Sequence, residues 1–161
     1  MAQLVDRREG RTERGGESTV RRPVVLGTLS VRVDPTAERM AIDSAIEAGA
    51  PLVIANILRL RMYPATLALV GPEGLNFPHE EDLDAVRATA HRAAELGVQT
   101  ELLRVTTRRA AAALLEIVRE RNAGLLVFGP DLRLTNRLRF WAVARRLRRD
   151  ASCLIWVAPD G

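Results

Sequence analysis

The chain has 161 residues, of which 47% are apolar, so it is long enough for one domain with a core of its own and lacks the run of about 20 apolar residues that a membrane-spanning helix needs. A single cysteine, Cys153, excludes an internal disulfide framework and a cysteine-rich metal centre, which fits a cytoplasmic protein. All 24 basic residues are Arg, but 20 acidic residues leave a net charge of only +4, which bears on solubility more than on a nucleic-acid partner.

The first 22 residues differ in character from the rest of the chain. They mix Arg, Glu and Gly and contain almost no apolar surface. Because such a segment buries too little to offset the entropy of ordering, we expect residues 1–22 to form a disordered arm. The folded domain is then expected to occupy residues 23–161.

Beyond the arm, short apolar runs alternate with helical patterns. Asp34 is placed to cap a helix that Pro35 begins and Gly49 ends. Residues 59–78 contain several Pro and Gly residues, and a connection of this length is usually functional or mobile. The expected strands lie at 24–29, 52–58, 98–105, 125–129 and 153–157. The expected helices alternate with them and lie at 35–48, 80–96, from a Thr106 or Thr107 cap to about Arg121, and at 140–149. The apolar residues of the first three helices are Ala37, Met40, Ala41, Ile42, Ala45 and Ile46 in the first, Leu83, Val86, Ala90 and Ala94 on one face of the second, and Leu114, Ile117 and Val118 facing inward in the third.

The alternation of strands and helices predicts the fold class. Strands that are separated by helices form a mainly parallel sheet with helices on both faces. The sequence therefore predicts an α/β fold of three layers in a doubly wound arrangement.

Three segments resemble the universal stress protein family. They are the start of the first helix at 37–41, the helix and strand at 112–129, and the closing helix and strand at 143–157 with an Ala-x-Cys step between them. The resemblance covers about residues 24–158. It implies the adenine nucleotide alpha hydrolase-like fold with a five-stranded sheet in the order 3-2-1-4-5, a homodimer that commonly forms through the last strand, and a regulatory role in bacterial stress response.

Many members of this family bind ATP through a loop after the fourth strand with the pattern Gly-x2-Gly-x9-Gly-Ser/Thr. Glycines let backbone N–H groups approach the phosphates. Here Gly129 stands at the first position, and Leu132 takes the second. The last pair is Trp141 and Ala142 when the closing helices are aligned, or Ala142 and Val143 by strict counting, so neither reading supplies a glycine or a hydroxyl.

The family's acidic residue at the end of the first strand is also missing. Leu29 or Ser30 stands there, and Asp34 is expected to serve as a helix cap. We therefore predict weak or absent ATP binding by the family's route and no bound cofactor.

A doubly wound sheet has a crevice at its switch point, between the carboxyl ends of the first and fourth strands. We predict that a ligand of this chain, if it has one, binds there through backbone groups and small hydroxyls. Close packing at strand ends is the other explanation for the two glycines, Gly27 and Gly129. The predicted ligand-binding residues are Thr28, Leu29, Ser30, Val31, Gly129, Pro130 and Leu132.

Residues 133–149 carry the strongest local charge bias of the chain. Seven Arg residues lie there, and the only nearby carboxylates are Asp131 and Asp150. This segment could bind the phosphates of a nucleotide, of RNA or of a phosphorylated partner, or it could be a solvated helix face. The predicted anion-binding residues are Arg133, Arg137, Arg145 and Arg149.

The last strand carries the remaining candidates. An apolar strand at the edge of a sheet invites pairing, so Leu154 and Trp156 are predicted to lie in a dimer interface. Cys153 is expected to be a buried, inert thiol. The sequence has no nucleophile elbow, Walker loop or zinc motif, and His79 and His91 are isolated, so we expect neither catalytic residues nor a metal site.

Two hypotheses of function follow from these observations. The first is a stress-response module that is not an enzyme and that acts as a homodimer through a small ligand or an unidentified protein partner. The alternative is an accessory protein on the same fold that binds anions, RNA or the ribosome through its Arg-rich segment. Neither hypothesis includes a membrane partner.

Overall fold

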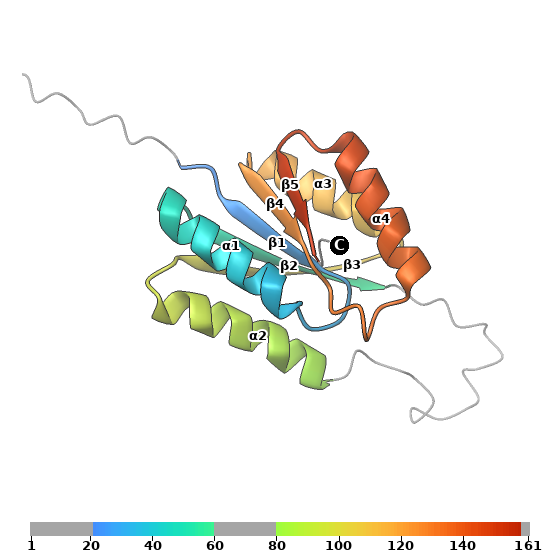
Figure 1. The fold of residues 1–161 in the computed structure, drawn as a ribbon, viewed down its shortest axis with the longest axis horizontal. Coiled ribbons are helices and arrows are strands. Elements are labelled where there is room, and N and C mark those ends of the chain that lie inside the picture. Colours follow the sequence, from blue (N-terminus) through green and yellow to red (C-terminus); the bar gives the residue numbers. More distant parts are fainter. Residues whose placement is uncertain (1–20, 60–79, 159–161) are drawn as a thin grey trace, which may run out of the picture.

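The computed structural model describes residues 21–59 and 80–158 (Figure 1). The expectations for the first 20 residues and for most of the connection at 59–78 lie outside these ranges. Within them, no helix is both long and apolar enough to cross a membrane. The strands are β1 (Val24–Thr28), β2 (Leu52–Arg59), β3 (Thr100–Thr107), β4 (Leu125–Phe128) and β5 (Leu154–Val157), and the helices are α1 (Pro35–Ala48), α2 (Glu80–Glu95), α3 (Ala110–Glu120) and α4 (Arg137–Asp150).

The five strands form one parallel sheet in the order β3-β2-β1-β4-β5, as predicted. β1 lies at its centre, with Val24 paired to Leu52 of β2 on one side and to Leu125 of β4 on the other. All five residues of β1 are buried, because helices cover both faces of the sheet.

The helices form two layers, with α1 and α2 on one face of the sheet and α3 and α4 on the other (Figure 1). Alternate residues of each central strand therefore enter different cores. In β1, Val25 packs with the α3 and α4 side, whereas Val24 and Leu26 pack with the α1 and α2 side. The three-layer fold class is confirmed.

The termini of α1 follow the sequence closely. The Asp34 carboxylate accepts hydrogen bonds from the backbone N–H groups of Thr36 (2.8 Å) and Ala37 (3.3 Å), and Pro35 opens the helix. Gly49 ends it with a φ of 56°, a left-handed conformation that glycine adopts without a steric penalty. Of the apolar residues along this helix, Ala37, Ala41, Ile42 and Ala45 are buried and Ile46 is exposed.

Arg21 lies inside the segment that the sequence assigns to the arm. Its guanidinium donates a hydrogen bond to the carbonyl of Gly49 (3.0 Å). Contacts with the domain therefore begin before Pro23.

The remaining helices show where local patterns mislead. On α2, Val86 is buried as predicted, but Ala93 rather than Ala94 faces the core. β3 begins two residues later than expected and extends through Thr107, so Thr107 does not cap α3; Arg109 holds the cap position without a side-chain bond. These residues form strand rather than the start of a helix because all eight residues of β3 pair with β2.

α4 begins three residues before the predicted start at 140. Asn136 is its N-cap and accepts a hydrogen bond from the backbone N–H of Arg139 (3.2 Å). The sequence reading overlooked this cap because Arg residues dominate the segment. As a result, residues 137–141 are helical rather than part of the loop after β4.

Candidate functional site

The carboxyl ends of β1 and β4 lie side by side at the point where the chain connections turn to opposite faces of the sheet. Gly27 pairs with Phe128, and the two following loops meet through an antiparallel bridge between Val33 and Pro130. Ligands of doubly wound proteins bind outside this edge. The residues predicted for ligand binding are all brought together here.

The two predicted hydroxyls at this edge bond within the protein. The Thr28 hydroxyl is fully buried and donates to the carbonyl of Val31 (2.7 Å). The Ser30 hydroxyl donates to the carbonyl of Ile57 (2.9 Å) and accepts from the N–H of Arg59 (3.2 Å), so it joins the ends of β1 and β2. Ser30 has a φ of 57°, which turns the chain sharply after β1.

The apolar members of the predicted set line the interior rather than a crevice. Leu29, Val31 and Pro130 are buried, and Leu132 packs against the core on the α3 and α4 side. Their role in ligand binding stays a prediction.

Gly129 is required by packing and by backbone pairing. A Cβ atom at this position would lie 2.1 Å from the Cβ of Ala37 and 3.2 Å from that of Ala158. Its N–H donates to the Gly27 carbonyl (3.1 Å), and its carbonyl accepts from the N–H of Asp34 (2.8 Å). Both backbone groups of Gly129 are therefore used inside the fold.

The loop between β4 and α4 is short. Counting the family's nine-residue spacer from Leu132 gives residues 133–141, and the last five of these lie in α4. Thr135, just before the helix cap, has a buried hydroxyl with no hydrogen-bond partner in the structure as described.

A cavity of about 450 Å³ opens beside this edge, on the face covered by α1 and α2. It is bordered by the loop after β1, the first turn of α1, one side of α2 and the loop after β4. Its charged and polar lining consists of Arg32, Asp34, Glu38, Thr89, Arg92, Asp131 and Arg133. We call this cavity the interhelical pocket.

An ion pair joins the two loops at one side of the interhelical pocket. The Arg32 guanidinium donates from Nε to the Asp131 carboxylate at 2.7 Å. Burial alone raises the pKa of Asp131, but the hydrogen bonds from Arg32 and from the backbone N–H of Arg133 outweigh it, and the net pKa is lowered. This carboxylate is therefore ionised at neutral pH.

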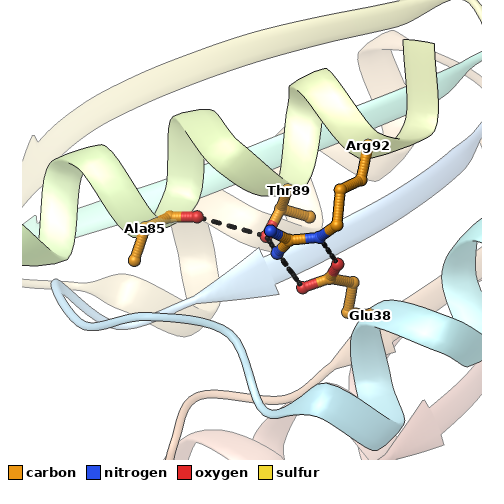
Figure 2. A network of polar contacts seen from close by, with 4 residues as sticks. All are labelled: Glu38, Ala85, Thr89 and Arg92. Carbon is orange, nitrogen blue, oxygen red and sulfur yellow. Dashed lines mark hydrogen bonds and ion pairs between the residues drawn. The ribbon is translucent and has the colours of Figure 1, made fainter. Parts of the chain in front are cut away.

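A second polar network joins α1 to α2 (Figure 2). Arg92 points from α2 toward Glu38 of α1 and donates from both Nε and Nη2, the latter at 2.8 Å. The buried Thr89 hydroxyl lies 2.9 Å from the same carboxylate and 3.3 Å from the carbonyl of Ala85. Burial raises the pKa of Glu38, and the bonds from Arg92 and Thr89 lower it by more.

The sequence reading missed the interhelical pocket. Thr89 and Arg92 lie three residues apart on one side of α2, a spacing that is common on any helix. Their partner Glu38 is 51 residues before Thr89, so no local pattern could reveal the network.

The Glu38 network predicts how stability depends on pH. Glu38 has a lowered pKa in the folded state, so its contribution is present above the ordinary value of 4.5 and is lost as the pH falls through the folded value. We expect Arg92→Gln to be less stable than wild type at neutral pH, and the difference in unfolding free energy to narrow as the pH is lowered from 7 through the ordinary Glu value of 4.5 and below. Urea unfolding across this range measures it.

The control for this prediction is Arg87→Gln. Arg87 pairs with Asp84 on the exposed side of the same helix, so its removal should change the unfolding free energy by less than about 0.5 kcal/mol at every pH. A difference between wild type and Arg92→Gln that stays constant with pH would refute the role given to Glu38.

The predicted anion-binding arginines do not form one site. Arg133 borders the interhelical pocket, Arg137 and Arg145 lie exposed on α4, and Arg149 pairs with Asp150 at the end of that helix (2.7 Å). Arg139, outside the predicted set, is partly buried, and this burial and then the charge of Arg59 lower its pKa. These arginines are close together in the sequence but lie in three different environments in the structure.

β5 is an edge strand of the sheet. Leu154 has 75% of its surface exposed, whereas Trp156 is partly buried against the α1 and α2 core. Cys153 lies just before this strand, partly buried, and burial raises the pKa of its thiol. That shift favours the protonated thiol at neutral pH, although Cys153 is less buried than the sequence predicts.

In the part of the chain that the structure describes, no group of three or more His, Cys, Asp or Glu side chains is placed to hold a metal ion. The interhelical pocket offers arginines, carboxylates and one hydroxyl, which suit the recognition of charged and polar groups.

Comparisons with known proteins agree with this architecture. A universal stress protein from Burkholderia pseudomallei is 21% identical and superposes with a TM-score of 0.62, covering 88% of this chain and 98% of that one. A universal stress protein solved in complex with cAMP is also 21% identical (TM-score 0.57; 87% and 98% covered), and one from Archaeoglobus fulgidus in complex with dAMP is 18% identical (TM-score 0.53; 86% and 98% covered). At these identities the likeness shows the fold.

No curated protein matches the sequence. The model of the Universal stress protein family matches residues 21–159, which is most of the chain. On this match, the chain belongs to the universal stress protein family.

Proposed function

We propose that this chain is a regulatory module of stress response that binds a small ligand carrying one phosphate in its interhelical pocket and does not hold ATP through a glycine-rich loop. The observation that carries the proposal is the interhelical pocket itself, which opens beside the switch-point edge and is lined by both βα loops. Two related folds were solved with the mononucleotides cAMP and dAMP, which supports a ligand of this class.

The charges in the interhelical pocket argue for one phosphate rather than three. Arg32 is paired with Asp131, and Arg92 with Glu38. Arg133 is the remaining guanidinium of the lining and has no ion pair within the described ranges. The charge of Arg133 also acts on nearby Asp131, but no ion pair holds its guanidinium there, so it can pair with one anionic group. Each further phosphate would face Asp34, Glu38 or Asp131 without a partner.

The region after β4 offers no replacement for a triphosphate cradle. Gly129 uses both of its backbone groups within the fold, and Leu132 fills the second glycine position with an apolar side chain. Residues 137–141, which the motif would need as loop, are helical, and the N–H groups of Arg139 and Phe140 are already bonded to Asn136. These features support binding that is independent of the glycine-rich route.

Titration calorimetry with AMP, cAMP and ATP tests the proposal. We expect AMP or cAMP to bind, and ATP to bind no more tightly than AMP. Replacing Arg133 by Gln should weaken binding about tenfold or more, as loss of a charge-assisted hydrogen bond does. The control is Arg137→Gln, which changes an exposed arginine at the first position of α4 that does not border the interhelical pocket.

Two results would contradict the proposal. One is ATP binding at micromolar concentration and at least tenfold tighter than AMP. The other is the absence of any monophosphate binding at millimolar concentration.

We also propose that the working form is a homodimer joined along β5. An edge strand with a largely exposed leucine invites pairing with a second copy. We expect light scattering to give twice the chain mass for wild type and the monomer mass for Leu154→Glu. Leu96→Glu, which changes an exposed leucine near the end of α2, should remain dimeric. A wild-type monomer at micromolar concentration would refute this arrangement.

The proposed action is binding rather than turnover. Among the described lining residues, Arg32 pairs with Asp131 and Arg92 with Glu38, and the Thr89 hydroxyl beside Glu38 belongs to a buried residue and is bonded between the two helices. A protein partner would recognise the form of the chain whose interhelical pocket is occupied. RNA or ribosome binding is the weaker proposal, because the arginines on which it depends lie in three separate surroundings.

A further inference from the structure

The outer face of α4 carries large apolar side chains that the core does not need. The inner face of this helix is complete, with Phe140, Val143, Ala144 and Leu147 buried. On the other side, Leu138 is 83% exposed and Trp141 is 54% exposed, and Leu134 in the preceding loop is 49% exposed. The outer face of a helix in a globular domain is normally polar, so these exposed side chains need an explanation.

The same face also carries positive charge. Of the seven arginines in residues 133–149, two, Arg137 and Arg145, belong to it. Arg137 and Arg145 are exposed and form no ion pair with any residue in the described ranges. At 100° per residue, Leu138, Trp141 and Arg145 project from one side of the helix over successive turns. We call Leu134, Arg137, Leu138, Trp141 and Arg145 the α4 outer patch.

We propose that the α4 outer patch binds the surface of an anionic lipid bilayer. Leu138 and Trp141 enter the boundary between headgroups and acyl chains, and Arg137 and Arg145 pair with lipid phosphates. Exposed Leu and Trp beside Arg is the composition of helices that lie in the membrane interface. Two exposed arginines and no carboxylate in the α4 outer patch complement a negative surface.

The shape of the α4 outer patch favours a bilayer over other anionic partners. The cavities described for this chain lie along α1 and α2, whereas Leu138 protrudes from its helix. A bilayer accepts a protruding leucine without needing a complementary groove. RNA would pair with the arginines but offers no apolar site for Leu138. The lack of a spanning helix does not bear on this mode, since surface binding requires no run of 20 apolar residues.

Vesicle co-sedimentation of the full chain tests this inference. We expect the chain to bind vesicles of phosphatidylcholine that contain about 40% phosphatidylglycerol, because this anionic lipid makes the vesicle surface strongly negative. Pure phosphatidylcholine vesicles should bind at least tenfold more weakly. Leu138→Gln should weaken the partition coefficient about tenfold, and the double change Arg137→Gln with Arg145→Gln about thirtyfold.

Matched variants separate the α4 outer patch from general effects. Arg39→Gln with Arg119→Gln removes the same charge from exposed sites on α1 and α3, and Leu96→Gln removes an exposed leucine near the end of α2. Each should leave the partition coefficient within about twofold of wild type. Tryptophan emission gives a second readout: anionic vesicles should shift it to shorter wavelength in wild type and not in Trp141→Phe.

Three outcomes would overturn the proposal. They are no binding to anionic vesicles at low salt, equal losses in the α4 variants and their controls, and binding of a single-stranded RNA that is tighter than vesicle binding and unaffected by Leu138→Gln. None of them depends on whether a monophosphate binds in the interhelical pocket, so this inference and the proposed function fail separately.

Discussion

Replacing Phe140 by Ala is expected to lower the free energy of unfolding by about 3–5 kcal/mol. The Phe140 ring is 1% exposed and stacks on Phe128 of β4 with a centroid distance of 5.5 Å and an interplanar angle of 11°. It also packs against Trp141 in a T-shaped arrangement, with the two ring centroids 5.3 Å apart. Alanine would leave a cavity between α4 and the sheet, and chemical denaturation monitored by circular dichroism measures the cost.

Leu138→Ala is the matched control for Phe140→Ala, two residues away on the same helix. Because Leu138 is almost fully exposed, its truncation should change stability by less than about 0.5 kcal/mol. Equal losses in the two variants would mean that Phe140 does not anchor α4. That result would also undermine the assignment of the inner and outer faces used above.

Gly129→Ala is the second substitution with a large expected effect. The new Cβ would lie 2.1 Å from the Cβ of Ala37, an atom fixed to the backbone of α1, so the helix itself must move. We expect a loss of about 1–3 kcal/mol from overpacking, measured by urea unfolding. Gly27→Ala should cost less, because its nearest neighbour at 2.9 Å is the flexible end of Leu114.

A double variant tests whether the loss comes from this contact. Removing the opposing methyl group with Ala37→Gly costs up to about 1 kcal/mol in helix propensity. Combined with Gly129→Ala it should restore part of the lost stability, giving a coupling of about 0.5 kcal/mol or more between the two sites. Strict additivity would mean that Gly129 is required for a reason other than packing against α1.

Much of the fold was predictable because its signals are local. Asp34, Pro35 and Gly49 fix the ends of α1 through their own backbone chemistry, and the alternation of strands and helices fixes a parallel sheet. The errors have local causes as well. Thr106 or Thr107 was expected to cap α3, but pairing with β2 extends β3 through both residues.

The candidate site was less predictable, because it depends on contacts between distant segments. The predicted crevice residues do meet, yet the hydroxyls of Thr28 and Ser30 bond to neighbouring carbonyls, which no residue count reveals. The interhelical pocket requires Glu38 and Arg92 to meet across two helices. Tertiary geometry decides both.

The pairing of Glu38 with Arg92 has a consequence for local stability. In the described part of α2, the fully buried apolar side chains are small, Val86 and Ala93, so hydrophobic burial holds this helix weakly against the sheet. Elements with few buried contacts open more often than the rest of a domain. A ligand that spans α1 and α2 would therefore slow the exchange of α2 amide hydrogens with solvent and leave the exchange of β1 amide hydrogens unchanged. Ligand binding would then make one side of the molecule more rigid.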